Sequence, residues 1–343
     1  MPQIKIAVLF GGCSEEHDVS VKSAKEIMKS LDPEKYDPIP IGITKNGAWK
    51  MCDLADFGWE NRPCREVLLS PDRTTHGLLV LEDGGYQIIR LDAVLPVLHG
   101  KTGEDGAIQG LLELSGIPYV GCGIESSVLC MDKALTHLIV KNAGIATPRF
   151  WLLTGDDAFD PSSLPYPVFV KPARSGSSFG VTKVENEVSF YGAVAAAREF
   201  DEKVLIEEAI IGSEVGCAVL GSGAELSVGE VDQITLTHGF FRIHQESAPE
   251  EGSENATVTV PAAISVKERE RVRETAKKIY RALGCTGLAR VDLFLQKDGK
   301  VVLNEVNTFP GCTAYSRYPR MMAAAGMPLS AVMDRCIDLA LKK

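Results

Sequence analysis

The sequence predicts an α/β protein made of three successive domains. Three observations lead to this class: the length of 343 residues, an opening strand, turn and helix, and a later change to a pattern richer in strands. Domains commonly hold roughly 100 to 200 residues, so this length provides for two or three hydrophobic cores. We expect the domains to span residues 1–121, 122–211 and 212–343.

The first domain begins with a buried strand and an amphipathic helix. Residues 4–10 form a short apolar run that ends in Gly11-Gly12, and residues 20–31 place their apolar side chains on one helical stripe. Continued alternation of strands and helices predicts a mainly parallel sheet. The further elements are strands at 39–44 and 93–98 and a helix at 107–115.

The pattern changes after a short helix expected at residues 132–142. Strands at 167–171 and 181–183 enclose a loop rich in glycine and serine, and another strand is expected at 204–207. The last part of the chain contains more strands, a long polar loop, a helix and a hairpin. Ser265 and Glu268 predict a capping box at the start of that helix.

The charge of the chain bears on its ligands. With 36 Lys+Arg against 46 Asp+Glu the formal charge is −10, which argues against a nonspecific binder of nucleic acid or membrane surfaces. An anionic ligand therefore needs local positive charge. No apolar run approaches the roughly 18 to 20 residues that span a membrane, and the first residues lack the features of a signal peptide. We expect a cytoplasmic protein.

The nine cysteines are scattered, odd in number and never arranged as Cys-x-x-Cys. This spacing predicts neither a disulfide framework nor a zinc site. We expect reduced thiols.

The segment 287–307 contains two apolar-rich runs separated by Asp298-Gly299, which predicts a hairpin with a two-residue turn. That register places Asp292 opposite Glu305 and Arg290 opposite Asn307, all on one face. Two carboxylates with Cβ atoms roughly 5 Å apart repel each other unless they are neutralised. Oxygen ligands favour Mg²⁺ or Mn²⁺. The alternative is a solvated sheet face on which Arg290 bridges the two acids, and both interpretations stay open.

Lysines and glycines raise a second question with open alternatives. Lys171 ends a strand before the loop 172–180, whose glycines and serines could cover a nucleotide phosphate or form an ordinary hairpin turn. Lys133 could contact phosphate or lie on the solvated surface. The strand end at Glu207-Glu208 could hydrogen-bond an adenine or expose two acids. Composition alone favours the second member of each pair, and the Walker and Gly-x-Gly-x-x-Gly patterns are absent.

Eight ordered segments together resemble the ATP-grasp family, and specifically the D-alanine:D-alanine ligases. The resemblance covers essentially the whole chain and is closest to the vancomycin-resistance branch, the D-alanine:D-lactate ligases. It implies a three-domain ATP-grasp fold with ATP held between the antiparallel sheets of the central and C-terminal domains. The segments are LFGGCSEEHDVS (9–20), LHGKTGEDGAIQG (98–110), GIPYVGC (116–122), MDK (131–133), VFVKPARSGSSFGV (168–181), VLIEEAI (204–210), GLARVD (287–292) and LNEVNTFPGCTAYSRYP (303–319).

The resemblance implies substrate and catalytic roles. Glu16 matches the acid that binds the ammonium of the first D-alanine, and Ser177 the serine that orients it. His99 matches the histidine beside that substrate. Groups that meet the intermediate and the carboxylate of the second substrate correspond to Arg290 and Ser316, with the Gly311 backbone nearby as an oxyanion donor.

The resemblance also implies roles toward ATP and metal. Two Mg²⁺ ions, or Mn²⁺, are expected at Asp292, Glu305 and Asn307. Lys133 and Lys171 match the lysines that contact the ATP phosphates. The other expected ATP contacts are Ser177, Ser178, Glu207, Glu208, Glu214, Asn304 and Glu305, among which Glu207 and Glu214 match the adenine and ribose contacts.

The choice of second substrate depends on the loop 239–246. Dipeptide ligases carry a Lys-Tyr pair there, whereas His244 resembles the histidine of the D-lactate branch; taken without the resemblance, a lone histidine is more often a surface residue. We expect a ligase for D-alanine and D-lactate, with D-alanine as the alternative second substrate. An ATP-binding regulator and another kind of ATP-grasp ligase are further alternatives. Cys312 and Ala314 depart from the pattern of the relatives, and a homodimer is expected from the family alone.

Overall fold

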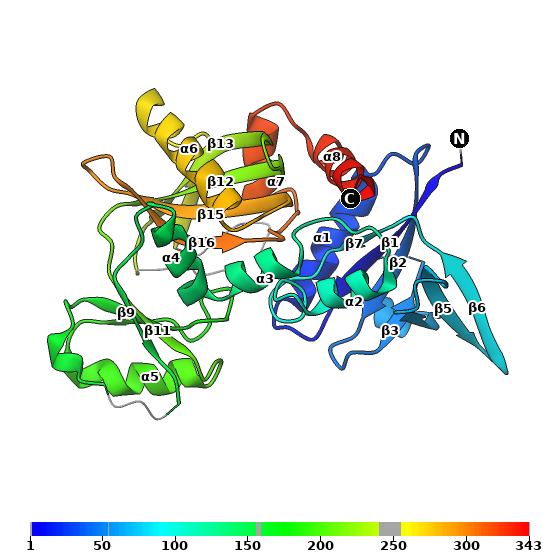
Figure 1. The fold of residues 1–343 in the computed structure, drawn as a ribbon, viewed down its shortest axis with the longest axis horizontal. Coiled ribbons are helices and arrows are strands. Elements are labelled where there is room, and N and C mark those ends of the chain that lie inside the picture. The colour runs from blue at the N-terminus through cyan, green and yellow to red at the C-terminus, as the bar shows by residue number, and fades with distance from the viewer. Residues whose placement is uncertain (1, 54, 156–158, 240–254, 343) are drawn as a thin grey trace.

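The computed structural model describes residues 2–53, 55–155, 159–239 and 255–342. Three β-sheets succeed one another along the chain, each covered by helices (Figure 1). Helices α3 (Ile124–Met131) and α4 (Lys133–Asn142) connect the first sheet to the other two. Within those ranges no helix is both long and apolar enough to cross a bilayer.

The first sheet has seven strands in the order β6-β5-β4-β3-β2-β1-β7. Only the neighbours β2, β1 and β7 pair in parallel, and all other pairs are antiparallel. The expectation of a mainly parallel sheet is therefore wrong. A parallel connection needs a crossover of about a dozen residues or more, usually a helix, and between β3 and β6 the described chain has only a 3₁₀ turn at Trp59–Asn61. The strands are β1 (Ile4–Gly11), β2 (Tyr36–Ile43), β3 (Trp49–Met51), β4 (Arg65–Leu69), β5 (Gly77–Glu82), β6 (Gly85–Arg90) and β7 (Ala93–Pro96).

Helices cover both faces of this sheet. Side chains of β1 alternate between two cores: Val8 packs with α1 (His17–Ser30) and α8 (Leu329–Leu341), and Leu9 packs with α2 (Ala107–Ser115). The expected helix at 107–115 has those bounds, and the expected helix at 20–31 begins three residues earlier.

The second and third sheets are antiparallel, as the resemblance implies. The second has the order β10-β9-β11-β8 and packs against α5 (Phe190–Arg198). The third has the order β14-β13-β12-β15-β16. Their strands are β8 (Phe150–Leu153), β9 (Val168–Pro172), β10 (Thr182–Val184), β11 (Val204–Glu208), β12 (Ser213–Ser222), β13 (Glu225–Leu236), β14 (Ala256–Thr259), β15 (Gly287–Leu295) and β16 (Val301–Asn307).

The third sheet also has a helix on each face. Helix α6 (Val266–Ala282) packs against the face that carries Cys217 and Val219, and α7 (Arg317–Ala324) packs with Ala218 and Leu220 on the other face. The predicted capping box starts α6: the Ser265 hydroxyl accepts from the Glu268 N–H, and the Glu268 carboxylate accepts from the Ser265 N–H.

The hairpin register is confirmed at the acids and wrong at the turn. Arg290 pairs with Asn307 and Asp292 with Glu305, but beyond them Leu293 pairs with Leu303. Residues 296–300 form the connection, which is longer than a two-residue turn. A β-bulge that contains Asn304 shifts the register back by one residue. The longer turn and the bulge thus cancel, and the two carboxylates lie opposite each other.

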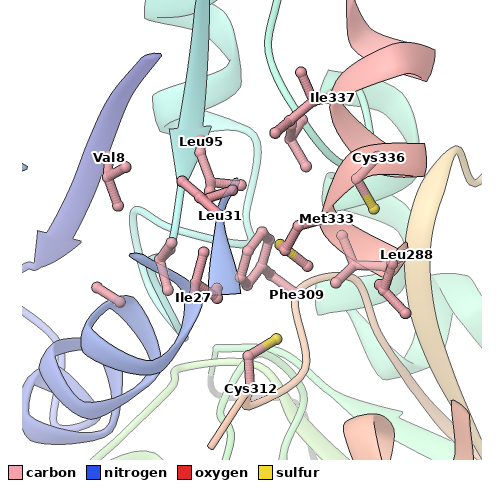
Figure 2. Packing of buried hydrophobic residues seen from close by; sticks show 14 of the residues in the cluster. Val8, Ile27, Leu31, Leu95, Leu288, Phe309, Cys312, Met333, Cys336 and Ile337 are labelled. Atoms are coloured by element: carbon pink, nitrogen blue, oxygen red, sulfur yellow. The ribbon is translucent and has the colours of Figure 1, made fainter. Parts of the chain in front are cut away.

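One continuous core joins the first and third sheets. Phe309 and Cys312, from the loop that follows β16, pack among side chains of α1, β7 and α8, including Ile27, Leu95 and Met333 (Figure 2). The two parts of the molecule therefore share apolar contacts through residues that lie far apart in the sequence.

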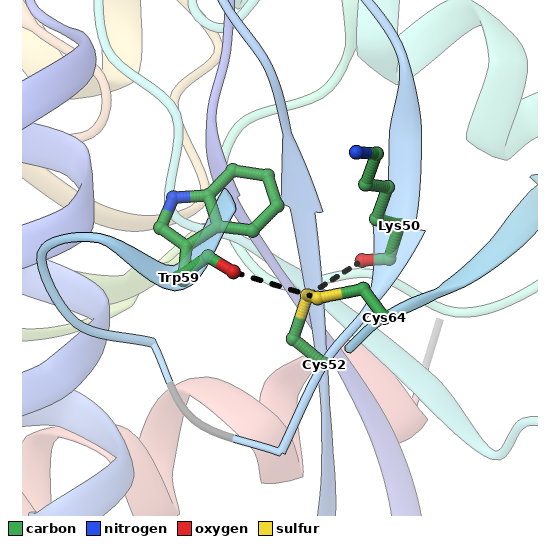
Figure 3. The surroundings of a disulfide bond; sticks show 4 residues. All are labelled: Lys50, Cys52, Trp59 and Cys64. Atoms are coloured by element: carbon green, nitrogen blue, oxygen red, sulfur yellow. Dashed lines mark hydrogen bonds between the residues drawn. A yellow bond between two sulfur atoms is a disulfide. The ribbon is translucent and has the colours of Figure 1, made fainter. Parts of the chain in front are cut away.

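Cys52 and Cys64 form a disulfide with a Cα–Cα distance of 4.8 Å (Figure 3). The expectation that all thiols are reduced is wrong at this pair. The bond closes a segment that carries Trp59, whose ring lies edge-on to Phe10 with centroids 5.3 Å apart. Antiparallel pairing of β3 with β4, in which Met51 lies opposite Arg65, places Cys52 beside Cys64, which the spacing of the cysteines alone did not indicate.

We predict that the disulfide stabilises the first sheet. Closing a loop of this length removes entropy from the unfolded chain worth about 3 kcal/mol, so the double variant Cys52→Ser/Cys64→Ser should have a lower Tm. In denaturant without reductant, a thiol reagent should count seven thiols in the oxidised protein and nine after reduction. A Tm equal to that of the oxidised parent would contradict the prediction.

Candidate functional site

The residues singled out in the sequence converge where loops from the three sheets meet. Glu16 precedes α1, His99 follows β7, and the Ser-rich loop (residues 174–180) follows β9. Asp292 and Glu305 lie on β15 and β16. Direct contacts link these segments, so the predicted residues belong to one region of the molecule.

Glu16 and Ser177 are in contact, as the resemblance implies. The Ser177 hydroxyl donates to Glu16 Oε1 at 2.7 Å, across 161 residues of chain. Ser177 and Ser178 have φ values of +50° and +59°, which non-glycine residues seldom adopt and which occur preferentially at functional sites. Gly100 has a φ of +68°, and a Cβ there would lie 2.8 Å from Glu16 Oε2. The carboxylate is therefore held between two loops and one hydrogen-bond donor.

His99 is buried and links β7 to the loop after β16. Its Nδ1 hydrogen bonds to the Phe309 carbonyl at 2.8 Å, so Nδ1 carries the hydrogen, and its Nε2 lies 3.3 Å from the Ser23 hydroxyl. The ring is thereby fixed beside the Glu16 loop, since the Ser14 hydroxyl donates to the His99 carbonyl.

Glu104 also links these segments, although the sequence assigned it no role. Its carboxylate accepts from the backbone N–H groups of Gly100 and Phe309. Burial raises the pKa of Glu104, with the charge of His99 opposing and that of Glu16 adding to the effect. The only sequence signal was its place within the segment 98–110.

Two lysines line the neighbouring part of the site. Lys133 donates to the Ser175 carbonyl at 2.7 Å and lies 3.5 Å from Glu305, so it is not a solvated surface residue. Lys171 is buried and pairs with Glu207 at 2.7 Å. Both lysines place positive charge beside the Ser-rich loop and beside β15 and β16, the strands that carry the candidate metal ligands.

The Glu207 carboxylate is satisfied within the protein. Besides Lys171 it is bonded to His137 Nε2 at 2.7 Å, a partner that sequence reasoning missed. Burial raises the pKa of Glu207, but the Lys171 charge and the His137 contact outweigh burial and lower it to about 2. Contact with an adenine base would therefore come from the β11 backbone.

The next two acids have different surroundings. Glu208 is bonded to the backbone N–H and the guanidinium of Arg149. Glu214, on β12, lies 4.0 Å from Arg317 and near the acids of β15 and β16. Burial raises the pKa of Glu214 to about 7, although Arg317 opposes the shift.

The acid pair on β15 and β16 fits a hard cation shared with a phosphate. Arg290 binds Asp292 through three contacts of 2.7 to 3.0 Å, while Glu305 faces Lys133. Arg290 therefore does not bridge the two acids. Among the described residues no group of three or more His, Cys, Asp or Glu could hold a metal by itself. Two carboxylates and the Asn307 amide form an oxygen set that Mg²⁺ typically completes with substrate phosphates and water.

Ser316, Thr313 and Gly311 lie at the other end of the site. The Ser316 hydroxyl is 2.6 Å from the Thr313 hydroxyl. A Cβ at Gly311 would lie 3.0 Å from the Ser316 hydroxyl. A cavity of about 310 Å³ adjoins this turn, and Ala314 lines it together with side chains of α1. Cys312 is completely buried in the shared core, so its thiol supports packing. His244 lies outside the described residues.

Known protein families and proteins match this chain over nearly its whole length. Family models described as the N-terminus and C-terminus of D-ala D-ala ligase match residues 5–122 and 139–338. A D-alanine–D-lactate ligase of Streptomyces coelicolor, provisionally so named, is 65% identical, and the vancomycin/teicoplanin A-type resistance protein VanA of Enterococcus faecium is 62% identical, with 99% and 100% of each chain covered. A D-alanine–D-alanine ligase of Caldicellulosiruptor bescii is 43% identical over 100% of this chain and 96% of its own.

A solved structure is also similar over the full length. The VanG D-Ala:D-Ser ligase from Enterococcus faecalis superposes with a TM-score of 0.89 at 42% identity, covering 99% of this chain and 100% of its own.

The raised pKa of Glu214 predicts that the stability of the nucleotide-free protein depends on pH. An unfolded glutamate titrates at about 4.3, whereas the folded pKa is about 7. Protonated Glu214 therefore contributes stability that is complete below the unfolded pKa and is lost as pH rises through 7. The Tm of Glu214→Gln, minus that of the parent, should increase from pH 5 to pH 7 and then level off. Glu199→Gln, at an exposed position, is the control, and a Tm difference for Glu214→Gln that does not change with pH would contradict the prediction.

Proposed function

Because this chain belongs to the D-alanine–D-alanine ligase family, we propose that it is an ATP-dependent ligase that joins D-alanine to D-lactate. The observation that carries the proposal is the position of the Glu16 carboxylate. Glu16 is held by Ser177, and the same loop meets Lys133, which in turn contacts Glu305. An amino acid whose ammonium binds Glu16 would thus direct its carboxylate toward the cationic end of the site, where phosphate is expected.

The first step activates a carboxylate. A D-alanine carboxylate oxygen attacks the γ-phosphorus of ATP, the bond to the β-γ bridging oxygen breaks, and an acylphosphate and ADP are formed. Lys133 and Lys171 would hold the phosphate oxygens, since both ammonium groups lie at this end of the site. Asp292, Glu305 and Asn307 would hold Mg²⁺ or Mn²⁺, with two ions expected; bound metal neutralises charge on the transferring phosphoryl group.

The second step forms the ester. The hydroxyl of D-lactate attacks the acyl carbon, the bond from that carbon to the phosphate oxygen breaks, and the hydroxyl proton leaves with the released phosphate. Arg290 and the Gly311 N–H would stabilise the oxyanion, and Ser316 would bind the carboxylate of D-lactate. The Ser-rich loop would cover the reacting groups, because water would hydrolyse an acylphosphate.

Two reasons favour the assignment of D-lactate, and not D-alanine, as the second substrate. A relative named for D-lactate is more similar to this chain than the one named for D-alanine. His244 supplies an imidazole, which is cationic at mildly acidic pH, and a cation would disfavour the ammonium of D-alanine more than the hydroxyl of D-lactate. The depsipeptide would enter peptidoglycan precursors, in keeping with the resistance function in the name of a relative. Ordinary D-alanine–D-alanine ligation is the second candidate.

The surroundings of the reaction follow from its substrates. We place the protein in the cytoplasm, where ATP is available, and expect a homodimer from the family and no nucleic-acid or membrane partner. The proposed domains are residues 1–121, 122–211 and 212–343, with ATP between the second and third.

The central prediction concerns the product. Incubation with ATP, Mg²⁺, D-alanine and D-lactate should release ADP only when D-alanine is present, and mass spectrometry should detect D-alanyl-D-lactate. Exclusive formation of D-alanyl-D-alanine would favour the second candidate. ATP binding without ADP release would indicate a regulator.

A further prediction concerns pH. With D-alanine and D-lactate in competition, the ratio of ester to amide should rise as pH falls through the titration of His244, whose unperturbed pKa is about 6.5. The ratio in His244→Tyr should be lower and should not vary over that range. A flat ratio in the parent, or a variant that behaves like the parent, would remove His244 from the explanation.

A further inference from the structure

We propose that Arg317, anchored by Asp232, is a positioning residue that ties the metal ligand Asp292 to the turn that binds the second substrate. The inference rests on the proposed function and adds two residues to its machinery. Both residues are buried, and neither carries a role in the sequence motifs.

The anchor lies in a row of residues across four strands. Asp232 on β13, Gly216 on β12, Asp292 on β15 and Glu305 on β16 are successive cross-strand partners, which places their side chains on one face. We call these four residues the carboxylate row. Three of the four positions are acidic, so the row requires neighbouring cations.

Gly216 provides the space that one of those cations occupies. A Cβ at this position would collide with the Arg317 guanidinium and would lie 2.5 Å from Asp232 Oδ1 and 3.1 Å from Asp292 Oδ1. The missing side chain lets one guanidinium lie over Gly216 and reach the acid on each side. A glycine in the interior of a strand commonly marks such a close approach.

Arg317 uses its whole guanidinium in this space. Nε and Nη2 bind the two oxygens of Asp232 at 2.6 and 2.8 Å, and Nη1 lies 3.1 Å from Asp292 Oδ1. Burial lowers the pKa of Arg317, but Asp292 and Asp232 outweigh burial and raise it. The bidentate pair fixes the direction in which Nη1 points.

The two arginines that contact Asp292 therefore differ in how they are held. The hydrogen bonds of Arg290 in the described structure all go to Asp292, the residue expected to bind metal. Arg317 has an independent anchor in Asp232. A cation at Asp292 can thus replace the contact with Arg290, leaving that residue available to the oxyanion, while Arg317 keeps Asp292 oriented through Oδ1.

Arg317 also carries this constraint to the second substrate. It is the first residue of α7 and directly follows Ser316, so the position of its guanidinium restricts the turn 313–316. Tyr318, the next residue, donates to the Val219 carbonyl on β12 and is completely buried. The phosphoryl-transfer end and the acyl-acceptor end of the site are thereby connected through one residue.

The test uses Asp232→Asn, which removes the charged anchor and keeps a group of the same size. Mn²⁺ affinity, measured by electron paramagnetic resonance with a non-hydrolysable ATP analogue, should weaken about tenfold or more, as for other residues that orient metal ligands. The KM for D-lactate should rise, while the KM for the first D-alanine stays near that of the parent. Arg273→Met is the matched control, because it breaks the 2.7 Å ion pair with Glu230 outside the row. This variant should lower the Tm and leave the Mn²⁺ affinity and the KM for D-lactate unchanged.

A double-variant cycle separates positioning from general damage. If Asp232 acts through Arg317, Asp232→Asn/Arg317→Lys should bind Mn²⁺ no more weakly than Arg317→Lys alone. Additive losses, or parent values of Mn²⁺ affinity and D-lactate KM in Asp232→Asn, would overturn the inference. Should Asp232→Asn fail to fold, Arg317→Lys is measured in its place, with the same expected losses. Failure of the proposed function would appear differently, as absence of the ester product from the parent protein.

Discussion

Neutralising the buried acids of the carboxylate row is the constraint on which the site depends. Asp232 is 0% exposed and Asp292 2%, and uncompensated charges at such positions would strongly destabilise the fold. The compensating cations come from different parts of the chain: Arg290 from β15, Arg317 from α7 and Lys133 from α4. The helices around the third sheet must pack in one arrangement for all three to reach the row. In the proposed reaction Lys133 and Arg290 have chemical roles and Arg317 has a positioning role, so the arrangement that stabilises the fold also prepares the site.

A second constraint joins this sheet to the substrate loops of the first. Phe309 places its ring in the core of the N-terminal sheet, while its backbone is bonded to His99 and Glu104. The same segment continues into Gly311 and Ser316. The group expected to bind the first substrate and the groups expected to bind the second are therefore held at a set separation. Proximity of this kind is a large part of the catalytic advantage in a two-substrate reaction.

Local signals predicted the elements well and their partners unevenly. The capping box at Ser265, the bounds of α2 and the pairing of Asp292 with Glu305 were all predicted from the sequence. The parallel character of the first sheet was overestimated, because short strands joined by turns resemble alternating elements when read one at a time. The register predicted at the turn (residues 296–300) was wrong by one residue, and the bulge at Asn304 restored the predicted pairing of the two acids. The disulfide was missed because Cys52 and Cys64 meet through the antiparallel pairing of β3 with β4, which was not predicted from the sequence.

The sequence by itself determined the family and the hairpin that carries the two acids, because these depend on residue types at fixed spacing, and through the resemblance it predicted the nucleotide and metal residues. Only the tertiary structure decided how their charges are balanced. Lys133 contacts Glu305, and Glu207 pairs with Lys171 and His137. That Asp232 and Arg317 belong to the site is seen only in the folded structure. Asp232 and Arg317 lie 85 residues apart, and Ser177 and Glu16 lie 161 apart. Contacts over such separations leave no periodic pattern in the chain, since they are set by how the helices, sheets and loops pack together.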